Sequence, residues 1–300
     1  MNKEIMLVSD SACNLTKTDC EELNVQIVPF LISLDGIEYA KEDYSFDIYG
    51  FYKTLVENPK LKPKSACPQI GDYQKLFERA YENNQDVICI CLTSKFSTSY
   101  NAACVARDMV YEENDNKIKI EVVDSLSITH AQGMLVRQVS SMIKEGMKFE
   151  EIIEKIEEIK KTSRVFFTTN DVEYLSRGGR IGKLALSIVD KVNIKPIIYF
   201  KDGDITIPTV AIGRNRSLMK VKEKIKQYFS NNKHNINDYM FCVGYGYDNE
   251  EGKKFYDSLI SMLKDFALNI EIKLRIISAT IGVHTGPGPI GLCIIKKYNC

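Results

Sequence analysis

The sequence lacks an excess of charge of either sign. Forty lysine and arginine residues balance 40 aspartate and glutamate residues over 300 positions. A neutral chain produces no long-range field that attracts nucleic acid or an anionic membrane. We therefore expect no nucleic-acid partner, and recognition of any other partner has to come from local groups of residues.

Long apolar runs are also absent. The first ten residues, MNKEIMLVSD, contain a run far too short for a signal peptide, and no later stretch approaches the length of a membrane span. These features predict a cytoplasmic protein without stable membrane insertion.

Cysteine pairs with the spacing of a zinc site are missing as well. The nine cysteines are scattered along the chain. Cys89 and Cys91 lie two residues apart in an apolar run, which is typical of small core residues on a strand. The sequence predicts free thiols and no structural metal.

Two common signatures of enzymes do not occur. No G-x-S-x-G elbow is present, and the glycine-rich segment GGRIG at 178–182 has the spacing of neither a P-loop nor a dinucleotide-binding turn. We therefore expect no cofactor.

What the sequence does contain is a regular alternation of apolar runs and helical patterns in its first half. Helices are predicted at 47–57 and 72–82, and the runs DVICICLTS and KIKIEVVDS each lead into another helix. This order predicts an α/β domain over residues 1–162, built on a doubly wound and mostly parallel sheet.

In the second half, hairpins replace crossovers. The strands IKPIIYF and ITIPTVAI are joined by the turn KDGD, and helices are predicted near 215–230 and 249–267. These elements predict a mixed α+β domain over residues 163–300.

Polar residues follow three of the predicted parallel strands. They are Ser9, Asp10 and Ser11; Thr93 and Ser94; and Asp124 and Ser125. Such strand ends share one edge of a sheet, where ligands bind, although about half of these residues are expected to cap helices. The segment TSKFSTSY at 93–100 has more hydroxyls than one cap uses. It predicts a site for a carboxylate or phosphate, which Ser65 also reaches.

A second polar segment, IGVHTGPGPIG, occupies residues 281–291. An apolar strand predicted over about Leu274–Ile281 leads into His284 and then into a loop where glycines alternate with prolines. Gly286 and Gly288 accept positive φ, while the prolines fix the chain between them. The loop is either a rigid support beside His284 or a tight hairpin between two strands.

A basic group surrounds the double glycine. It consists of Arg177, Arg180 and Lys183, with Arg214 and Arg216 further along the chain. Arginines on a glycine-bearing loop are suited to docking a partner that handles phosphate, whereas most such charges are only solvated.

Seven segments together resemble the DegV family of bacterial fatty-acid-binding proteins, and the likeness covers essentially the whole chain. In order, they are VSDSACNL, SACPQIGDY, TSKFSTSYNAA, VVDS, VEYLSRGGRIG, IKPII and IGVHTGPGPIG. The resemblance implies a two-domain fold that is not an enzyme by itself. It also implies a long-chain fatty acid in a buried tunnel and a separate ATP-dependent kinase that phosphorylates the acid to an acyl phosphate.

The resemblance also implies roles for individual residues. The carboxylate of the fatty acid would be held by Ser65, Thr93, Ser94, Ser97 and His284, with Gly286 and Gly288 in a supporting loop and Arg177 and Arg180 docking the kinase. Four positions depart from the family pattern: Ala66, Cys67, Gln69 and Thr98. They affect the shape of the site and the preference for chain length, and the resemblance fixes no oligomeric state.

One alternative function is a stand-alone serine hydrolase or acyltransferase. Its nucleophile would be Ser94 or Ser97, with His284 as the base and Asp10 as the third member of the set. Turnover of acyl esters without a kinase would distinguish it from a binding protein.

Overall fold

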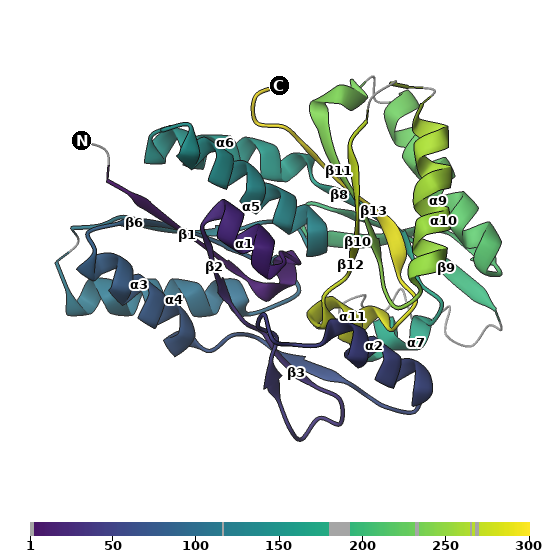
Figure 1. The fold of residues 1–300 in the computed structure, drawn as a ribbon, viewed down its shortest axis with the longest axis horizontal. Coiled ribbons are helices and arrows are strands. Elements are labelled where there is room, and N and C mark those ends of the chain that lie inside the picture. The colour runs from purple at the N-terminus through teal and green to yellow at the C-terminus, as the bar shows by residue number, and fades with distance from the viewer. Residues whose placement is uncertain (1–2, 116, 180–192, 232–233, 265, 268–269) are drawn as a thin grey trace.

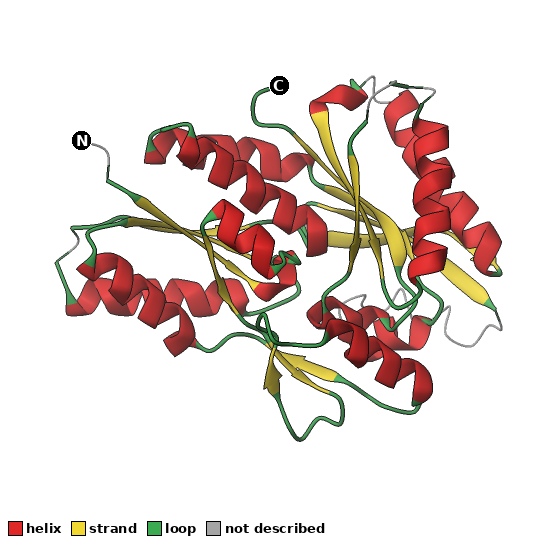
Figure 2. Cartoon of the chain, viewed as in Figure 1, coloured by secondary structure: helices red, strands yellow, loops and turns green. Residues whose placement is uncertain are grey.

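The computed structural model describes residues 3–115, 117–179, 193–231, 234–264, 266–267 and 270–300. These residues form two large β-sheets and one small one, with helices in layers between and around them (Figures 1 and 2). Within these ranges, no helix combines the length and the apolar character that crossing a membrane requires.

The first sheet is parallel, as the sequence predicts. Its four strands, in spatial order, are β2 (Val25–Val28), β1 (Ile5–Asp10), β6 (Asp86–Cys91) and β7 (Ile120–Asp124). The central strand β6 is buried at every position, which explains why its sequence is a continuous apolar run. Helices α3 (Ile70–Glu82) and α4 (Ser99–Glu113) pack on one face of this sheet.

The second sheet is mixed and contains the predicted hairpin. Its strands, in spatial order, are β10 (Asp204–Ile212), β9 (Ile194–Lys201), β8 (Arg164–Thr168), β13 (Ile290–Lys296), β11 (Tyr239–Tyr245) and β12 (Ile272–Ile276). The turn between β9 and β10 places Asp202 and Gly203 at φ 52° and 79°. An Asp-Gly pair suits these angles, so the turn residues set the register of the hairpin.

Two helices between the large sheets give them a shared core. Helices α5 (Thr129–Lys144) and α6 (Phe149–Ile159) pack against apolar side chains of both sheets (Figure 1). Helices α9 (Arg214–Asn231) and α10 (Asn249–Leu263) cover the outer face of the second sheet. The two halves therefore meet through a continuous apolar layer, and the division near residue 162 remains a prediction.

The small third sheet lies beside three short helices contributed by both halves of the chain. The sheet consists of β4 (Ala40–Lys41), β3 (Leu31–Ser33) and β5 (Lys64–Ala66), and the helices are α2 (Ile48–Glu57), α7 (Val172–Arg177) and α11 (Ala279–Thr285). One apolar cluster joins Ile32, Tyr52, Tyr174 and Val283. This cluster fixes α11, near the C-terminus, onto elements from the start of the chain.

The remaining short elements lie at junctions. They are α1 (Lys17–Leu23) and the 3₁₀ turns η1 (Ser11–Cys13), η2 (Lys160–Thr162) and η3 (Ile236–Asp238). Helix α1 begins with a capping box between Thr16 and Asp19, so its start is specified locally.

The predicted strand over Leu274–Ile281 is wrong in its second half. The strand β12 ends at Ile276, and Ala279–Thr285 form helix α11. The strands on either side of residues 277–289 do not pair with each other, because β11 lies between β12 and β13 in the sheet. A short apolar run fits a strand or a helix equally well, and here a contact from a distant residue decides between them.

That distant residue is Glu42, whose buried carboxylate accepts hydrogen bonds from the first turn of α11. One oxygen accepts from the backbone N–H of Thr280 at 3.1 Å, and the other accepts from the Ser11 hydroxyl at 2.9 Å and from the Thr280 hydroxyl. The backbone N–H of Glu42 in turn donates to the carbonyl of Phe30 at 2.8 Å. The oxygens of Glu42 satisfy the backbone N–H and the hydroxyl of Thr280 in the first turn, so Glu42 stabilises the helical form of this segment.

This environment generates a prediction about pH. Burial raises the pKa of the Glu42 carboxyl to about 7, even though the hydrogen bonds from Thr280 act to lower it. Between the unfolded and folded pKa values the folded protein keeps a proton that the unfolded chain releases. The stabilising contribution is therefore complete at acidic pH and is lost as the pH rises through about 7.

Glu42→Gln keeps the volume of the side chain but does not ionise. Between pH 5 and pH 8, the free energy of unfolding of the wild type should fall by roughly 2 to 3 kcal/mol more than that of Glu42→Gln. Urea denaturation at both pH values measures this difference. Glu38→Gln, at an exposed position of the same segment, should follow the wild type. Parallel pH profiles for the wild type and Glu42→Gln would contradict the prediction.

Candidate functional site

The polar ends of the parallel strands do lie together at one edge of the first sheet, but one of them has a structural role. Asp10, at the end of β1, is buried and accepts hydrogen bonds from Leu92 N at 2.8 Å, Ser99 Oγ at 2.7 Å and Gln132 Nε2 at 2.9 Å. Burial raises the pKa of this carboxyl. Asp10 ties β1 to β6, α4 and α5, and this network fixes the edge on which the site is built.

Apolar side chains line a cavity of about 410 Å³ beside this edge. The volume lies within the range of small-molecule sites, roughly 300 to 1,000 Å³. Its apolar lining consists of Phe30, Leu92, Phe96, Ile128, Phe167, Leu175, Ile205 and Ile281. These residues come from both halves of the chain, so the cavity lies where the two halves meet.

The lining also contains polar residues, of which Ser65, Ser94, Ser97 and His284 were expected to hold a carboxylate; we call these four residues the polar end. The central contact of this polar end joins Ser65 Oγ to His284 Nε2 at 3.0 Å. Ser65 lies on β5, whereas His284 lies in the last turn of α11. Four of the five residues expected to hold a carboxylate therefore line a single cavity.

The other hydroxyls at this end have bonds of their own. Ser94 donates its hydroxyl hydrogen to Asp124 Oδ2 at 2.5 Å, and Ser97 Oγ accepts from the backbone N–H of Ser99 at 3.1 Å. Ser97 thus serves partly as a helix cap, the alternative that the sequence left open. A ligand carboxylate would draw on Ser94 only if the hydroxyl turned away from Asp124.

Thr93 is the fifth expected residue, and it does not line the cavity. Its hydroxyl is buried, has no hydrogen-bond partner among the described residues, and lies 2.8 Å from where a Cβ on Gly203 would be placed. The side chain of Thr93 is packed under the β9–β10 turn. The sequence alone does not show which of Thr93 and Ser94 lines the cavity, because the side chains of consecutive residues after a strand point in different directions.

Two of the departures from the family pattern meet at the cavity. The Thr98 hydroxyl donates to Cys67 Sγ at 3.1 Å, and both residues line the cavity. Ala66 lies beside Ser65 on β5, and Gln69 is the residue that precedes α3. The hydroxyl of Ser65 is retained, so the first loop still contributes a donor to the polar end.

The glycine and proline loop supports α11 from behind and does not line the cavity. Gly286 ends α11 at φ 70°, and a Cβ there would lie 2.6 Å from the ring of Tyr174. A Cβ on Gly288 would lie 2.8 Å from Asn170 Nδ2. The carbonyls of Pro287 and Pro289 accept from backbone N–H groups of residues 246–247. The loop is therefore a packed support that fixes the end of α11, and His284 with it, and the hairpin alternative is wrong.

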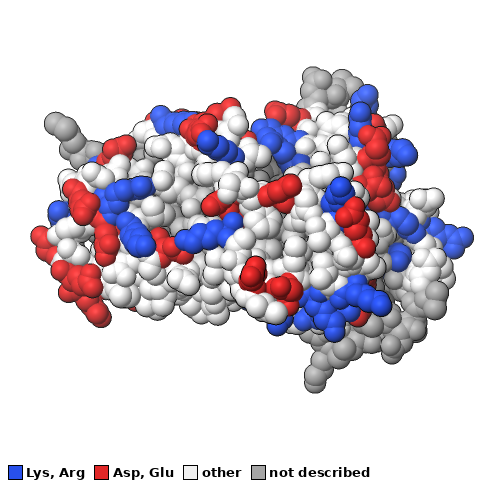
Figure 3. All heavy atoms as spheres, turned by 60° about the horizontal axis from the view of Figure 1, so that its bottom comes forward, with Lys and Arg blue, Asp and Glu red and all other residues white. Residues whose placement is uncertain are grey.

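The basic residues have separate environments. Arg177, at the end of α7, pairs with Glu173 one turn earlier, and Arg214 forms a two-pronged ion pair with Glu251 at 2.7 and 2.8 Å. Arg180 and Lys183 lie outside the described residues, and Arg216 is exposed. Figure 3, which brings the bottom of Figure 1 forward, shows lysine and arginine side chains in several places on this face, with aspartate and glutamate side chains between them.

The Ser-His-Asp set of the alternative function is not assembled in the described structure. The Asp10 carboxylate already accepts hydrogen bonds from Leu92, Ser99 and Gln132. The Ser94 hydroxyl donates to Asp124 instead. The imidazole Nε2 of His284 contacts Ser65, which was not the expected nucleophile. This arrangement orients polar groups toward a cavity but does not form the expected triad.

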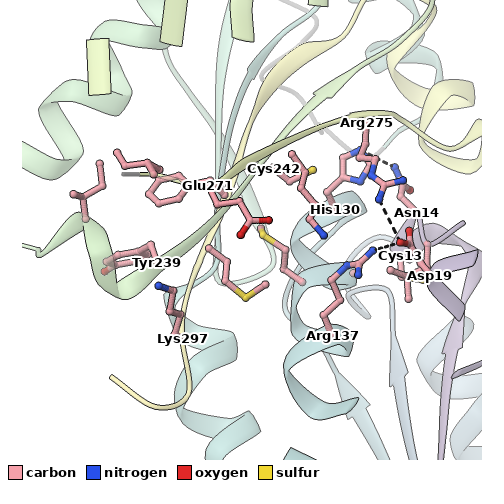
Figure 4. A pocket seen from close by; sticks show the side chains of 18 of the residues that line it. Cys13, Asn14, Asp19, His130, Arg137, Tyr239, Cys242, Glu271, Arg275 and Lys297 are labelled. Carbon is pink, nitrogen blue, oxygen red and sulfur yellow. Dashed lines mark hydrogen bonds and ion pairs between the residues drawn. The ribbon is translucent and has the colours of Figure 1, made fainter. Parts of the chain in front are cut away.

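A second cavity, of about 370 Å³, lies between α1 and α5 on one side and β11 and β12 on the other (Figure 4). Asp19 receives Arg137 Nη2 at 2.5 Å and Arg275 Nη2 at 3.3 Å. Burial acts to raise the pKa of Asp19, but the bonds from Arg137 and Thr16 outweigh it and hold that pKa below its usual value. This cavity shares no lining residue with the apolar one, and its central charges join the two halves of the protein.

The chain is similar to known proteins over nearly its whole length. Residues 4–297 match a family described as "Uncharacterised protein, DegV family". A DegV domain-containing protein of Clostridium perfringens is 31% identical over 299 residues, covering 98% of this chain and 99% of the relative.

Solved structures show the same fold. A stearic-acid-binding protein from Eubacterium ventriosum is 37% identical, with a TM-score of 0.89, and the match covers 100% of this chain and 99% of that one. DegV from Bacillus subtilis, described as a fatty acid binding protein, is 26% identical with a TM-score of 0.83 over 98% of this chain and 100% of that one. Both the two-sheet fold and its mixed α/β character are thus shared with proteins that bind fatty acids. The chain described here belongs to the DegV family.

Proposed function

We propose that this protein binds a long-chain fatty acid, with the tail in the apolar cavity and the carboxylate at its polar end. The observation that carries the proposal is the lining of the cavity, which combines apolar side chains with the hydrogen-bonded pair Ser65 and His284. A fatty acid has the same division into a long apolar tail and one charged group. The stearic-acid-binding relative at 37% identity supports this ligand class.

The tail would supply most of the affinity. Each buried methylene contributes about 0.8 kcal/mol, so a sixteen-carbon chain offers on the order of 10 kcal/mol before the costs of association and ordering. Phe96 and Phe200, whose ring centroids lie 5.6 Å apart edge to face, stiffen the wall near Ile205. A rigid apolar wall reduces the ordering cost on the protein side.

The carboxylate would be held by hydroxyl groups and an imidazole. Ser65 and His284 are hydrogen-bonded to each other, and a hydroxyl or an imidazole N–H can donate to a carboxylate that replaces this contact. Ser94 and Ser97 lie at the same end and add further hydroxyls. A site of this kind satisfies the charge without a fully buried ion pair, which would carry a large desolvation cost.

We further propose that the bound acid is presented to a separate ATP-dependent kinase, which converts it to an acyl phosphate. The support is positional: a cavity lined by Arg177 also contains Ser65 and His284 in its wall. A partner that docks on this basic side would find the carboxylate end of the ligand and not the buried tail. Arg180 follows Arg177 by three positions in the sequence but lies outside the described residues.

A prediction about Ser65 tests ligand binding. Wild-type protein should bind palmitate, and Ser65→Ala should bind it ten- to a hundredfold more weakly, because a hydrogen bond to a charged group is worth about 1.5 to 3 kcal/mol. Fluorescence competition or calorimetry measures both affinities. Ser141→Ala is a matched control, since its hydroxyl bonds only to Arg137 O within its own helix. Wild-type protein that fails to bind palmitate or oleate would disprove the proposed function.

A prediction about Arg177 separates binding of the fatty acid from its presentation to the kinase. Arg177→Ala should leave the dissociation constant for palmitate within about twofold, because exposed charges contribute little to the burial of a tail. It should slow kinase-dependent formation of acyl phosphate, since charges at the edge of an interface act mainly on encounter and orientation. Lys75→Ala, on α3, removes an equal charge outside the cavity. Equal loss of binding and phosphorylation in Arg177→Ala would rule out the division of roles.

A further inference from the structure

The cavity between α1 and α5 on one side and β11 and β12 on the other contains more positive than negative charge. Its described lining has four basic side chains and two acidic ones. They are Arg137, Lys273, Arg275 and Lys297, and Asp19 and Glu271. The imidazole of His130, also in the lining, adds no charge, because burial lowers its pKa to about 3. The chain as a whole is neutral, so this excess is local, and a concave site of one sign attracts ions of the other.

Two arginines in this cavity share one buried carboxylate. Arg137 Nη2 and Arg275 Nη2 both contact Asp19 Oδ1, at 2.5 and 3.3 Å. The other oxygen, Oδ2, accepts from the backbone N–H of Thr16 at 3.1 Å. The side chains of Asp19 and Arg137 are only 7% and 17% exposed. One carboxylate balances one of the two guanidinium charges, and a charge that is largely buried without a partner is costly. A second anion beside the arginines would remove this cost.

The arginines also have hydrogen-bond donors to spare. A guanidinium group has five N–H donors in a fixed geometry that matches the oxygens of a carboxylate or a phosphate. Among the described residues, the side chains of Arg137 and Arg275 bond only to Asp19. Asp19 is itself fixed by the capping box at the start of α1. It therefore orients the two arginines and leaves most of their donors for another anion.

Further basic groups lie across the cavity from this cluster. Figure 4 shows Lys297 and Tyr239 on one side of the cavity, and Arg137, Asp19 and Arg275 on the other. Lys297 Nζ donates to the backbone carbonyl of residue 237 at 2.7 Å, which leaves two of the three ammonium donors. Lys273, on β12, forms no ion pair with a described residue. A ligand held at the arginines could thus place a second acid group near the lysines.

We propose that this cavity is a second ligand site, which binds a small organic anion with two acid groups. One acid group lies at the two arginines, and the other lies at Lys273 and Lys297. The carbon atoms between them pack on Met134 and Met240, whose unbranched side chains adapt to irregular shapes. The volume of about 370 Å³ lies within the range of small-molecule sites. The inference does not rest on fatty acid binding, because the two cavities share no lining residue.

The test uses three small ions of nearly the same shape. Glutarate has two carboxylates, and 4-phosphonobutyrate has a phosphonate in place of one of them. Glutaramate, the monoamide of glutarate, keeps the shape and loses one charge. Binding is followed by NMR titration at constant ionic strength, through the backbone amides of Gly133 and Arg275, which both line the cavity.

Two variants address the two ends of the ligand. Arg275→Gln removes one guanidinium group and keeps the ion pair between Arg137 and Asp19. Lys273→Gln/Lys297→Gln removes the lysines and keeps both arginines. The control is Lys253→Gln/Lys254→Gln, which removes the same charge from exposed positions on α10 outside the cavity.

Wild-type protein should bind glutarate with a dissociation constant in the millimolar range or below. It should bind glutaramate about tenfold more weakly, because the amide loses a charge-assisted contact. Arg275→Gln should bind glutarate about tenfold more weakly than the wild type. In the cavity lysine variant, glutarate should lose most of its advantage over glutaramate, whereas the control should match the wild type. Tighter binding of 4-phosphonobutyrate than of glutarate would identify the natural ligand class as carrying a phosphate, and the reverse order would identify a dicarboxylate.

Three results would overturn the second site. They are the absence of shifts at Gly133 and Arg275 with both glutarate and 4-phosphonobutyrate, equal affinities of the wild type for glutarate and glutaramate, and equal behaviour of the cavity lysine variant and the control. If Arg275→Gln does not fold, the comparison between the two lysine variants decides by itself. Palmitate binding is measured on the same samples, and its failure in the wild type would remove the proposed function without affecting the second site.

Discussion

The site depends on how α11 is held against the small sheet at the start of the chain. Ser65 and His284 are 219 residues apart, and their hydrogen bond exists only because α11 packs on β3 and β5. Three contacts fix the helix: the Glu42 carboxylate at its first turn, the Tyr52 hydroxyl donating to Ser278 O at 3.3 Å, and the apolar cluster that includes Val283. A disturbance at any of these would move the imidazole relative to Ser65.

The same arrangement separates the chemistry of the ligand into two parts. Under the proposed function, apolar residues from both halves of the chain, such as Leu92 and Phe167, would surround the tail, where the gain in free energy grows with buried area and needs no exact geometry. The polar end is different, because hydrogen bonds require short distances and correct directions. That end lies on two short elements, β5 and α11, which carry Ser65 and His284.

Much of the fold could be predicted from the sequence because its signals are local. The apolar run at 86–91 and the Asp-Gly turn at 202–203 each specify their structure through a few neighbouring residues. The ends of parallel strands also had to meet at one edge, so the hydroxyls of Ser94 and Ser97 were expected near a ligand. These inferences needed periodicity and topology only.

The rest depended on contacts between distant residues. Glu42 gave no signal in the sequence, because a glutamate in a polar segment is usually exposed, and yet its carboxylate starts α11. Residues 279–281 were predicted as strand for the same reason: their helical form is stabilised by a residue more than 200 positions away.

The claim at the centre of this account is that a buried tail supplies the affinity, and a series of chain lengths tests it most directly. Dissociation constants for saturated fatty acids of 10, 12, 14 and 16 carbons, measured below their micelle concentrations, should tighten by roughly tenfold for each added pair of methylenes until the cavity is filled. Dissociation constants that stay the same from 10 to 16 carbons would show that the tail is not buried in the apolar cavity, and would contradict the account.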